Sequence, residues 1–116
     1  MKKETLLLFL IVSLLPNIVT AAAFATNLTV TDIFASNNNH GIISFSTNFP
    51  NLNACAGGAS YQNALAIDLN TPGGRGMLSI ALAAKTSNKQ VEAQGTDSCT
   101  LEPGTMEDAG YIRMLP

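Results

Sequence analysis

The chain lacks tryptophan, and it has one histidine, two cysteines and few charged residues. A structural zinc site needs about four ligands, and two thiols with a single histidine do not supply them. A nucleic-acid-binding surface needs clustered basic residues, whereas six Lys and Arg stand against eight Asp and Glu here, for a net charge of −2. We therefore expect no metal, no other cofactor and no nucleic-acid partner.

The main apolar run lies at the N-terminus and is too short to span a membrane. Two lysines precede an apolar stretch at residues 6–15, and a proline and an asparagine end it before the ~20 residues of a spanning helix are reached. Ala23 and Ala25 supply small residues at the two positions that a signal peptidase reads. The pattern predicts a signal peptide over residues 1–25 and a secreted or periplasmic domain over residues 26–116, with no membrane span left after cleavage.

The two cysteines, Cys55 and Cys99, form a pair that lies far apart in the sequence. An even cysteine count in a small exported domain is typical of a structural disulfide, whereas redox pairs usually have C-x-x-C spacing. A domain of this size buries only about 60 to 65% of its unfolded surface, so a cross-link contributing about 4 kcal/mol matters to its stability. We predict a structural disulfide between them.

The predicted elements indicate a mainly β fold with one helix. Alternating or β-rich patterns predict five strands, over residues 28–34, 42–47, 63–70, 90–95 and 110–115. A helix is predicted over residues 75–87, with Asn88 as its cap, and an Asn- and Gly-rich turn is predicted at residues 37–41. The resulting order, β-β-β-α-β-β, is that of a five-stranded OB-fold barrel.

The predicted helix is apolar around most of its circumference. At 100° per residue, its apolar side chains span an arc of roughly 260°. A single small sheet covers one side of such a helix, so the remaining apolar surface indicates contact with another subunit. The candidate interface residues are Met77, Ile80, Ala81 and Ala84. The alternative is that alanine tolerates exposure and that nothing packs on this side.

Part of the chain resembles a known family: residues 77–99, MLSIALAAKTSNKQVEAQGTDSC, and residues 109–115, AGYIRML. They are similar to the helix, the cysteine-bearing strand and the closing strand of the Shiga-type toxin B subunit and of secreted bacterial proteins like the subtilase cytotoxin B subunit. The resemblance implies an OB-fold protomer, a homo-oligomer in the form of a pentameric ring, binding of cell-surface glycans and a catalytic toxin subunit as partner. The family's first cysteine lies near the mature N-terminus, whereas Cys55 follows the second predicted strand, so the disulfide placement does not carry over.

Two groups of residues are candidates for ligand binding. Sugar recognition typically combines an aromatic platform with amide or carboxylate groups that make paired hydrogen bonds. Tyr61 with Gln62 and Asn63 matches this best, the alternative being a tyrosine packed on the barrel rim. Asn38 and His40 form the second group, because OB-folds bind ligands with the loop that joins strands one and two. A plain hairpin turn is the alternative there.

No catalytic residues are predicted. Glu107 and Asp108 are neighbours, so in a strand their side chains would point to opposite faces and would not act as a general acid and base. His40 has no nucleophile or metal partner identifiable from the sequence. We expect a secreted glycan-binding module rather than an enzyme, either a toxin B subunit or a stand-alone relative. The alternative is a periplasmic inhibitor or stress protein that binds another protein and no glycan.

Overall fold

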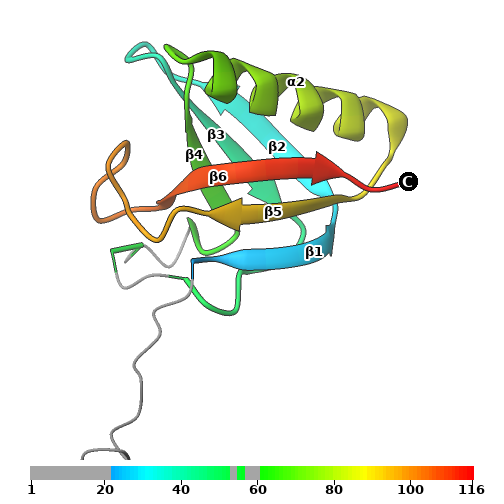
Figure 1. Ribbon diagram of the computed structural model, residues 1–116, viewed down its shortest axis with the longest axis horizontal. Coiled ribbons are helices and arrows are strands. Elements are labelled where there is room, and N and C mark those ends of the chain that lie inside the picture. Colours follow the sequence, from blue (N-terminus) through cyan, green and yellow to red (C-terminus); the bar gives the residue numbers. More distant parts are fainter. Residues whose placement is uncertain (1–21, 53–54, 57–60) are drawn as a thin grey trace, which may run out of the picture.

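A curled, mixed β-sheet and one helix make up the described part of the protein. A computed structural model describes residues 22–52, 55–56 and 61–116. These residues form a six-stranded half-barrel with a helix along one of its open sides (Figure 1). The elements are β1 (Phe24–Leu28), β2 (Val30–Ala35), β3 (His40–Phe45), β4 (Ala64–Asp68), α2 (Pro72–Ser87), β5 (Val91–Gly95) and β6 (Glu107–Met114).

The prediction of a mainly β fold with one helix is confirmed, but the predicted element order is wrong. Four strands precede the helix, so the order is β-β-β-β-α-β-β. The β-rich run expected to form one strand over residues 28–34 belongs to two strands that meet at Thr29. Asn27 adopts a left-handed φ of 56° just before this break, a conformation that asparagine tolerates and that β-propensity does not reveal. In place of the predicted five-stranded barrel the described residues form a six-stranded half-barrel, and the OB-fold is not confirmed.

The strands do not lie in sequence order across the sheet. Their spatial order is β1-β5-β6-β4-β3-β2, with antiparallel neighbours except for the parallel pair β4 and β6. The two edge strands, β1 and β2, are therefore consecutive in the chain and separated by Thr29 alone. The backbone N–H of Ser46, just after β3, donates to the carbonyl of Thr29 and anchors this corner.

The main hydrophobic core lies between α2 and the sheet. The helix contacts β2, β3, β4 and β6, and Figure 1 shows it lying across these strands. The largest fully buried side chains of this core are Leu28, Ile43, Phe45, Leu65, Ile67 and Val91. Ala81 and Ala84 face them from the helix with no exposed surface, which lets α2 approach the sheet closely.

The helix begins and ends at well-formed caps. The Thr71 hydroxyl accepts a hydrogen bond from the backbone N–H of Gly74 at 2.9 Å, and Pro72 follows in the first turn. A Cβ on Gly74 would lie 1.8 Å from the Asp68 carbonyl oxygen, so this close approach requires glycine. Asn88 ends the helix with a left-handed φ of 58°, as the sequence predicts.

The loop of residues 96–106, between β5 and β6, covers the other face of β3 and β4. Its Met106 and Leu101 pack there in a second apolar cluster with Ile42, Ala64 and Ala66. Because Leu65 and Ile67 of β4 face the main core, this strand is buried on both faces. Its continuous apolar sequence, ALAI, follows from that double burial.

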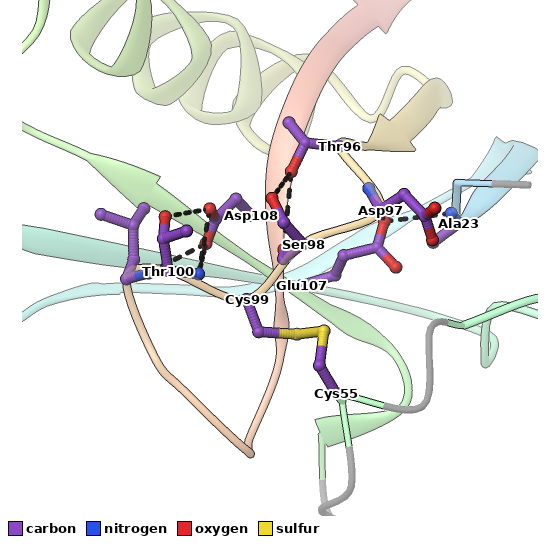
Figure 2. The surroundings of a disulfide bond; sticks show 10 residues. Ala23, Cys55, Thr96, Asp97, Ser98, Cys99, Thr100, Glu107 and Asp108 are labelled. Atoms are coloured by element: carbon purple, nitrogen blue, oxygen red, sulfur yellow. Dashed lines mark hydrogen bonds between the residues drawn. A yellow bond between two sulfur atoms is a disulfide. The ribbon is translucent and has the colours of Figure 1, made fainter. Parts of the chain in front are cut away.

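The predicted disulfide between Cys55 and Cys99 is present. It connects the loop of residues 96–106 to the segment that precedes β4, across a sequence separation of 44 (Figure 2). A loop of this length gives a stabilisation of about 4 kcal/mol in the chain-entropy description. The bond therefore fixes the covering loop over the outer face of β3 and β4.

The first strand includes residues that precede the predicted domain start at Thr26. Most of the predicted signal peptide, residues 1–21, lies outside the described residues, whereas Ala23 is fully buried and β1 begins at Phe24. Within the described ranges, no helix has the length and apolar character needed to cross a membrane.

The four predicted interface residues divide between two environments. Ala81 and Ala84 are fully buried in the core of their own subunit, which makes them unavailable to a second copy. Met77 and Ile80 are half-buried and pack against the edge of the same core. The apolar surface that α2 leaves exposed is centred on Leu82, which is 48% exposed.

The burial of α2 predicts that charged substitutions at two neighbouring alanines have very different effects on stability. We expect Ala84→Glu to lower the free energy of unfolding by about 3 to 5 kcal/mol, because it places an unpaired charge in the core. We expect Ala83→Glu, on the exposed side of the same helix, to change it by no more than about 0.5 kcal/mol. Urea denaturation followed by circular dichroism measures both. Equal stability of the two variants would contradict the placement of α2.

Candidate functional site

The structure places the two predicted ligand-binding groups at opposite ends of the β3–β4 pair. His40 lies opposite Asp68 at one end of the ladder. Asn63 lies at the other end, where its carbonyl accepts from the N–H of Phe45. Since five residues of a strand span about 17 Å, the two groups do not form one site.

Asn38 and His40 belong to a polar cluster at the β2–β3 turn. The Asn38 amide lies 3.2 Å from His40 Nδ1, and Glu102 Oε1 lies 3.2 Å from the same nitrogen. The Ser36 hydroxyl also contacts the Asn38 amide oxygen. The partners of these side chains come from the turn and from the loop of residues 96–106, so the cluster connects two parts of the fold.

Tyr61, Gln62 and Asn63 differ from one another in their surroundings. The Asn63 side chain donates to the Phe45 carbonyl at 2.8 Å, which makes it a structural contact. Gln62 Oε1 accepts weakly from Asn48 at 3.4 Å. Tyr61 is 39% exposed. A single ring with one neighbouring amide is the whole of this candidate within the described residues.

A third surface combines more of the expected chemistry. On the exposed face of β1, β5 and β6, Gln94 lies directly opposite Phe24 on one side and Tyr111 on the other. The two aromatic side chains are 41% and 37% exposed. The next row of this face pairs Glu92 with Arg113. We call these five residues the three-strand face; Figure 1 shows its strands side by side.

The alternation of the strands produces the three-strand face. Ala93 and Ile112, one position along from its residues, point into the core and are buried. Successive side chains of a strand point to opposite faces, so their neighbours in β5 and β6 point to solvent. Directly opposed residues on one face have Cβ atoms about 4.5 to 5.5 Å apart, which brings the five side chains into one continuous surface.

Glu92 organises the polar half of this face. Its Oε2 accepts from the Tyr111 hydroxyl at 2.8 Å and pairs with Arg113 Nη2 at 2.9 Å. The hydrogen bond to Glu92 is the main cause that raises the pKa of Tyr111 above its ordinary value, and the nearby Arg113 opposes the shift. The Glu92 side chain is 14% exposed and that of Arg113 64% exposed, so the carboxylate lies beneath and the guanidinium is open to a ligand.

An open hollow lies at the C-terminal end of the helix, two positions beyond the row of Glu92 and Arg113 along β5 and β6. It has a volume of about 530 Å³. Its lining residues are Asn27, Asn88, Lys89, Gln90, Leu115 and Pro116. The polar side chains of this lining form no hydrogen bond with other residues of the described chain. The hollow offers amide and ammonium donors but no aromatic ring, so it meets only half of the requirement for sugar recognition.

The paired acidic residues Glu107 and Asp108 are structural. Glu107 is fully buried and accepts from backbone N–H groups, while Asp108 accepts from the N–H groups of Thr100 and Leu101 at 3.1 and 3.0 Å (Figure 2). Glu107 thus holds the backbone at Ala23 and Asp97, and Asp108 holds the backbone of the loop that contains Thr100. Among the residues that the structure describes, no group of three or more His, Cys, Asp or Glu side chains gathers as a metal site would require.

The chain matches no protein-family model, no curated protein and no solved structure. The function must therefore be argued from the chemistry of the surfaces described above.

Sequence reasoning missed the three-strand face because its residues come from three separated segments. Phe24 falls inside the predicted signal peptide, and Tyr111 falls in a strand whose partner is not evident from the sequence. The alternation of Glu92 and Gln94 with apolar residues in β5 could have indicated an exposed polar face. It shows that both side chains face solvent, but it does not show which residues lie opposite them.

The raised pKa of Tyr111 predicts a pH dependence of stability. The folded state holds the tyrosine proton more tightly than the unfolded state, whose pKa is about 10. The stabilisation is therefore fully present below about pH 10 and is lost as the pH rises through the folded pKa. We expect the melting temperature to fall more steeply above about pH 10 in the wild type than in Tyr111→Phe. Parallel curves would contradict the Tyr111–Glu92 contact.

Proposed function

We propose that this protein is an exported binding module and that its three-strand face binds a glycan. The observation that carries the proposal is the row formed by Phe24, Gln94 and Tyr111, beside the pair of Glu92 and Arg113. Aromatic rings with amide and charged groups at one surface are the chemistry that sugar recognition uses. None of the other candidate surfaces of the described chain combines two exposed rings with these groups.

Each side chain has a distinct part in this binding. A sugar ring stacks its apolar C–H face on Tyr111 or Phe24, as aromatic platforms permit. The Gln94 amide and the Arg113 guanidinium donate to neighbouring hydroxyl groups, since both present planar sets of N–H donors. Glu92 holds Tyr111 and Arg113 in place through its Oε2 atom. The site therefore selects ligands with adjacent hydroxyl groups on a ring that also presents an apolar C–H face.

Export is supported by the signal-like N-terminus and by the disulfide. A disulfide persists in oxidising compartments, which is compatible with an extracellular or periplasmic location. The resemblance of residues 77–99 and 109–115 to Shiga-type and subtilase cytotoxin B subunits supports the same class of protein, with cell-surface glycans as ligands. A catalytic toxin subunit as partner has only that resemblance behind it.

The two tyrosines of the chain provide a matched test of the site. We expect Tyr111→Ala to weaken binding to a glycan identified on an array by about tenfold, equivalent to a loss of 1.4 kcal/mol of binding free energy. Tyr61→Ala removes an equally exposed ring elsewhere and should leave the affinity unchanged. Isothermal titration calorimetry measures the affinities, and a melting curve confirms that both variants are folded.

The opposite result, loss of binding in Tyr61→Ala alone, would move the site to the segment that precedes β4. An array on which the folded, oxidised protein binds no glycan would contradict the proposal. It would favour a periplasmic inhibitor or stress protein that binds another protein.

The proposed function includes assembly into a homo-oligomer, with a pentamer favoured by the resemblance. Weak single-site sugar binding becomes effective when several sites engage together. The exposed Leu82, one turn along α2 from the half-buried Leu78, supports a contact along this side of the helix. We expect light scattering at micromolar concentration to give the mass of several subunits, and Leu82→Glu to reduce it to one. A wild-type protein that is monomeric throughout this range would contradict the assembly.

A further inference from the structure

A fully buried carboxylate lies next to Ala23, close to the first residues that the structure describes. Glu107, the first residue of β6, has no exposed surface. Its Oε2 accepts from the backbone N–H of Ala23 at 3.0 Å and from that of Asp97 at 3.0 Å (Figure 2). Burying a charge is costly unless it is paired and hydrogen-bonded, so the groups that face this oxygen determine whether the site is stable.

The backbone on each side is built around this contact. A Cβ on Gly95 would lie 1.8 Å from Glu107 Oε2, so β5 leaves room for the carboxylate only because it ends in glycine. The N–H of Gly95 in turn donates to the Ala23 carbonyl at 2.7 Å. Ala23 is thus held at both its nitrogen and its oxygen, and its side chain is fully buried.

Ala23 and the residues after it belong to the fold. Phe24 and Ala25 pair with Gln94 and Ala93 of β5, and the Phe24 N–H donates to Asn51 Oδ1 at 2.9 Å. Cleavage after Ala25 would remove the partner of Glu107 and the first two residues of β1. It would also remove one aromatic ring of the three-strand face. The structure therefore favours cleavage before Ala23.

We propose that a signal peptidase hydrolyses the bond between Ala22 and Ala23, and that the resulting α-ammonium of Ala23 forms a buried ion pair with Glu107. Water adds across the peptide bond: the Ala22 carbonyl becomes a carboxylate, and the Ala23 nitrogen becomes the new α-amino group, protonated at neutral pH. Ala22 and Thr20 place small residues one and three positions before this bond. The proposal rests on the export that forms part of the proposed function.

After this cleavage, the Ala23 nitrogen that donates to Glu107 is a charged α-ammonium instead of a neutral backbone amide. The Ala23 nitrogen is already 3.0 Å from Oε2, so no rearrangement of the strand is needed. A charged donor adds Coulomb attraction to a hydrogen bond that a carboxylate already accepts from a neutral amide. The cut loses one contact, from Asn51 Nδ2 to the Ala22 carbonyl, and keeps the contact from Phe24 to the same side chain. Processing would thus give the buried carboxylate a positively charged partner at the Ala23 position.

The N-terminus of the exported protein tests the cleavage site. The full chain is expressed in an exporting bacterium, and the exported protein is analysed by intact mass and N-terminal sequencing. We expect Ala23 as the first residue. Ala22→Leu, which blocks cleavage at the proposed bond, should abolish that product. Ala25→Leu, which blocks cleavage at the bond expected from the sequence, should leave the product unchanged. Cleavage precedes folding, so this readout does not depend on the stability of either variant.

A first residue of Ala22, Phe24 or Thr26 would overturn the proposal and leave export standing. A product that retains Met1 would overturn both the proposal and export. The two failures are therefore distinguishable.

Amine labelling tests the ion pair itself. A succinimidyl ester at neutral pH reacts with free amines, and Lys89 is exposed and provides an internal standard. We expect the α-amine of the folded protein to react about tenfold more slowly than it does after denaturation, the factor that corresponds to one pKa unit. Glu107→Gln should restore its reactivity. If that variant does not fold, the wild-type comparison decides alone, and an α-amine as reactive in the folded as in the denatured protein would overturn the ion pair.

Discussion

The short connection between the two edge strands is the constraint on which the rest of the fold depends. A flat sheet of six strands would separate its edges by about 24 Å, five spacings of ~4.8 Å. Leu28 ends one edge strand and Val30 begins the other, and two residue steps span no more than about 7 Å. The sheet must therefore curl until its edges meet at this corner. The half-barrel follows from the connectivity rather than from side-chain preference.

Curling creates two surfaces that have to be covered, and different parts of the chain cover them. The helix α2 fills one side through its buried alanines, Ala81 and Ala84. The loop of residues 96–106 covers the opposite face of β3 and β4, where the disulfide and Asp108 hold it. Neither cover extends over the exposed side of β5 and β6. The aromatic and charged side chains of that side are therefore free to meet a ligand.

Local signals in the sequence predict the elements better than their arrangement. The helix, its Asn88 cap and the disulfide follow from periodicity, turn residues and cysteine count, and the strand predicted over residues 42–47 is present two residues earlier, as β3. The break at Thr29 does not, because the residues on both sides of it favour strands equally. The small residues at positions 23 and 25 fit a cleavage site as well as a buried strand, so the beginning of the fold could not be located from them.

The same distinction applies to the candidate site. Tyr61 with its neighbouring amides stands out because these residues are adjacent in the sequence. The Asn63 side chain, however, donates a hydrogen bond to the Phe45 carbonyl and is not free for a ligand. The partners of Tyr111 are set by the register of β5 against β6 and of β1 against β5. Register depends on how the whole sheet closes, and no short stretch of residues encodes it.

The three-strand face also limits what can be recognised. Its three strands are about 10 Å across, and its two rows of side chains are about 7 Å apart, since same-face residues of a strand are two positions apart. Such an area accommodates one or two monosaccharide units. Under the proposed glycan binding, a long polysaccharide and a short branch that share their one or two outermost units would therefore bind this face equally, because no contact extends beyond those units.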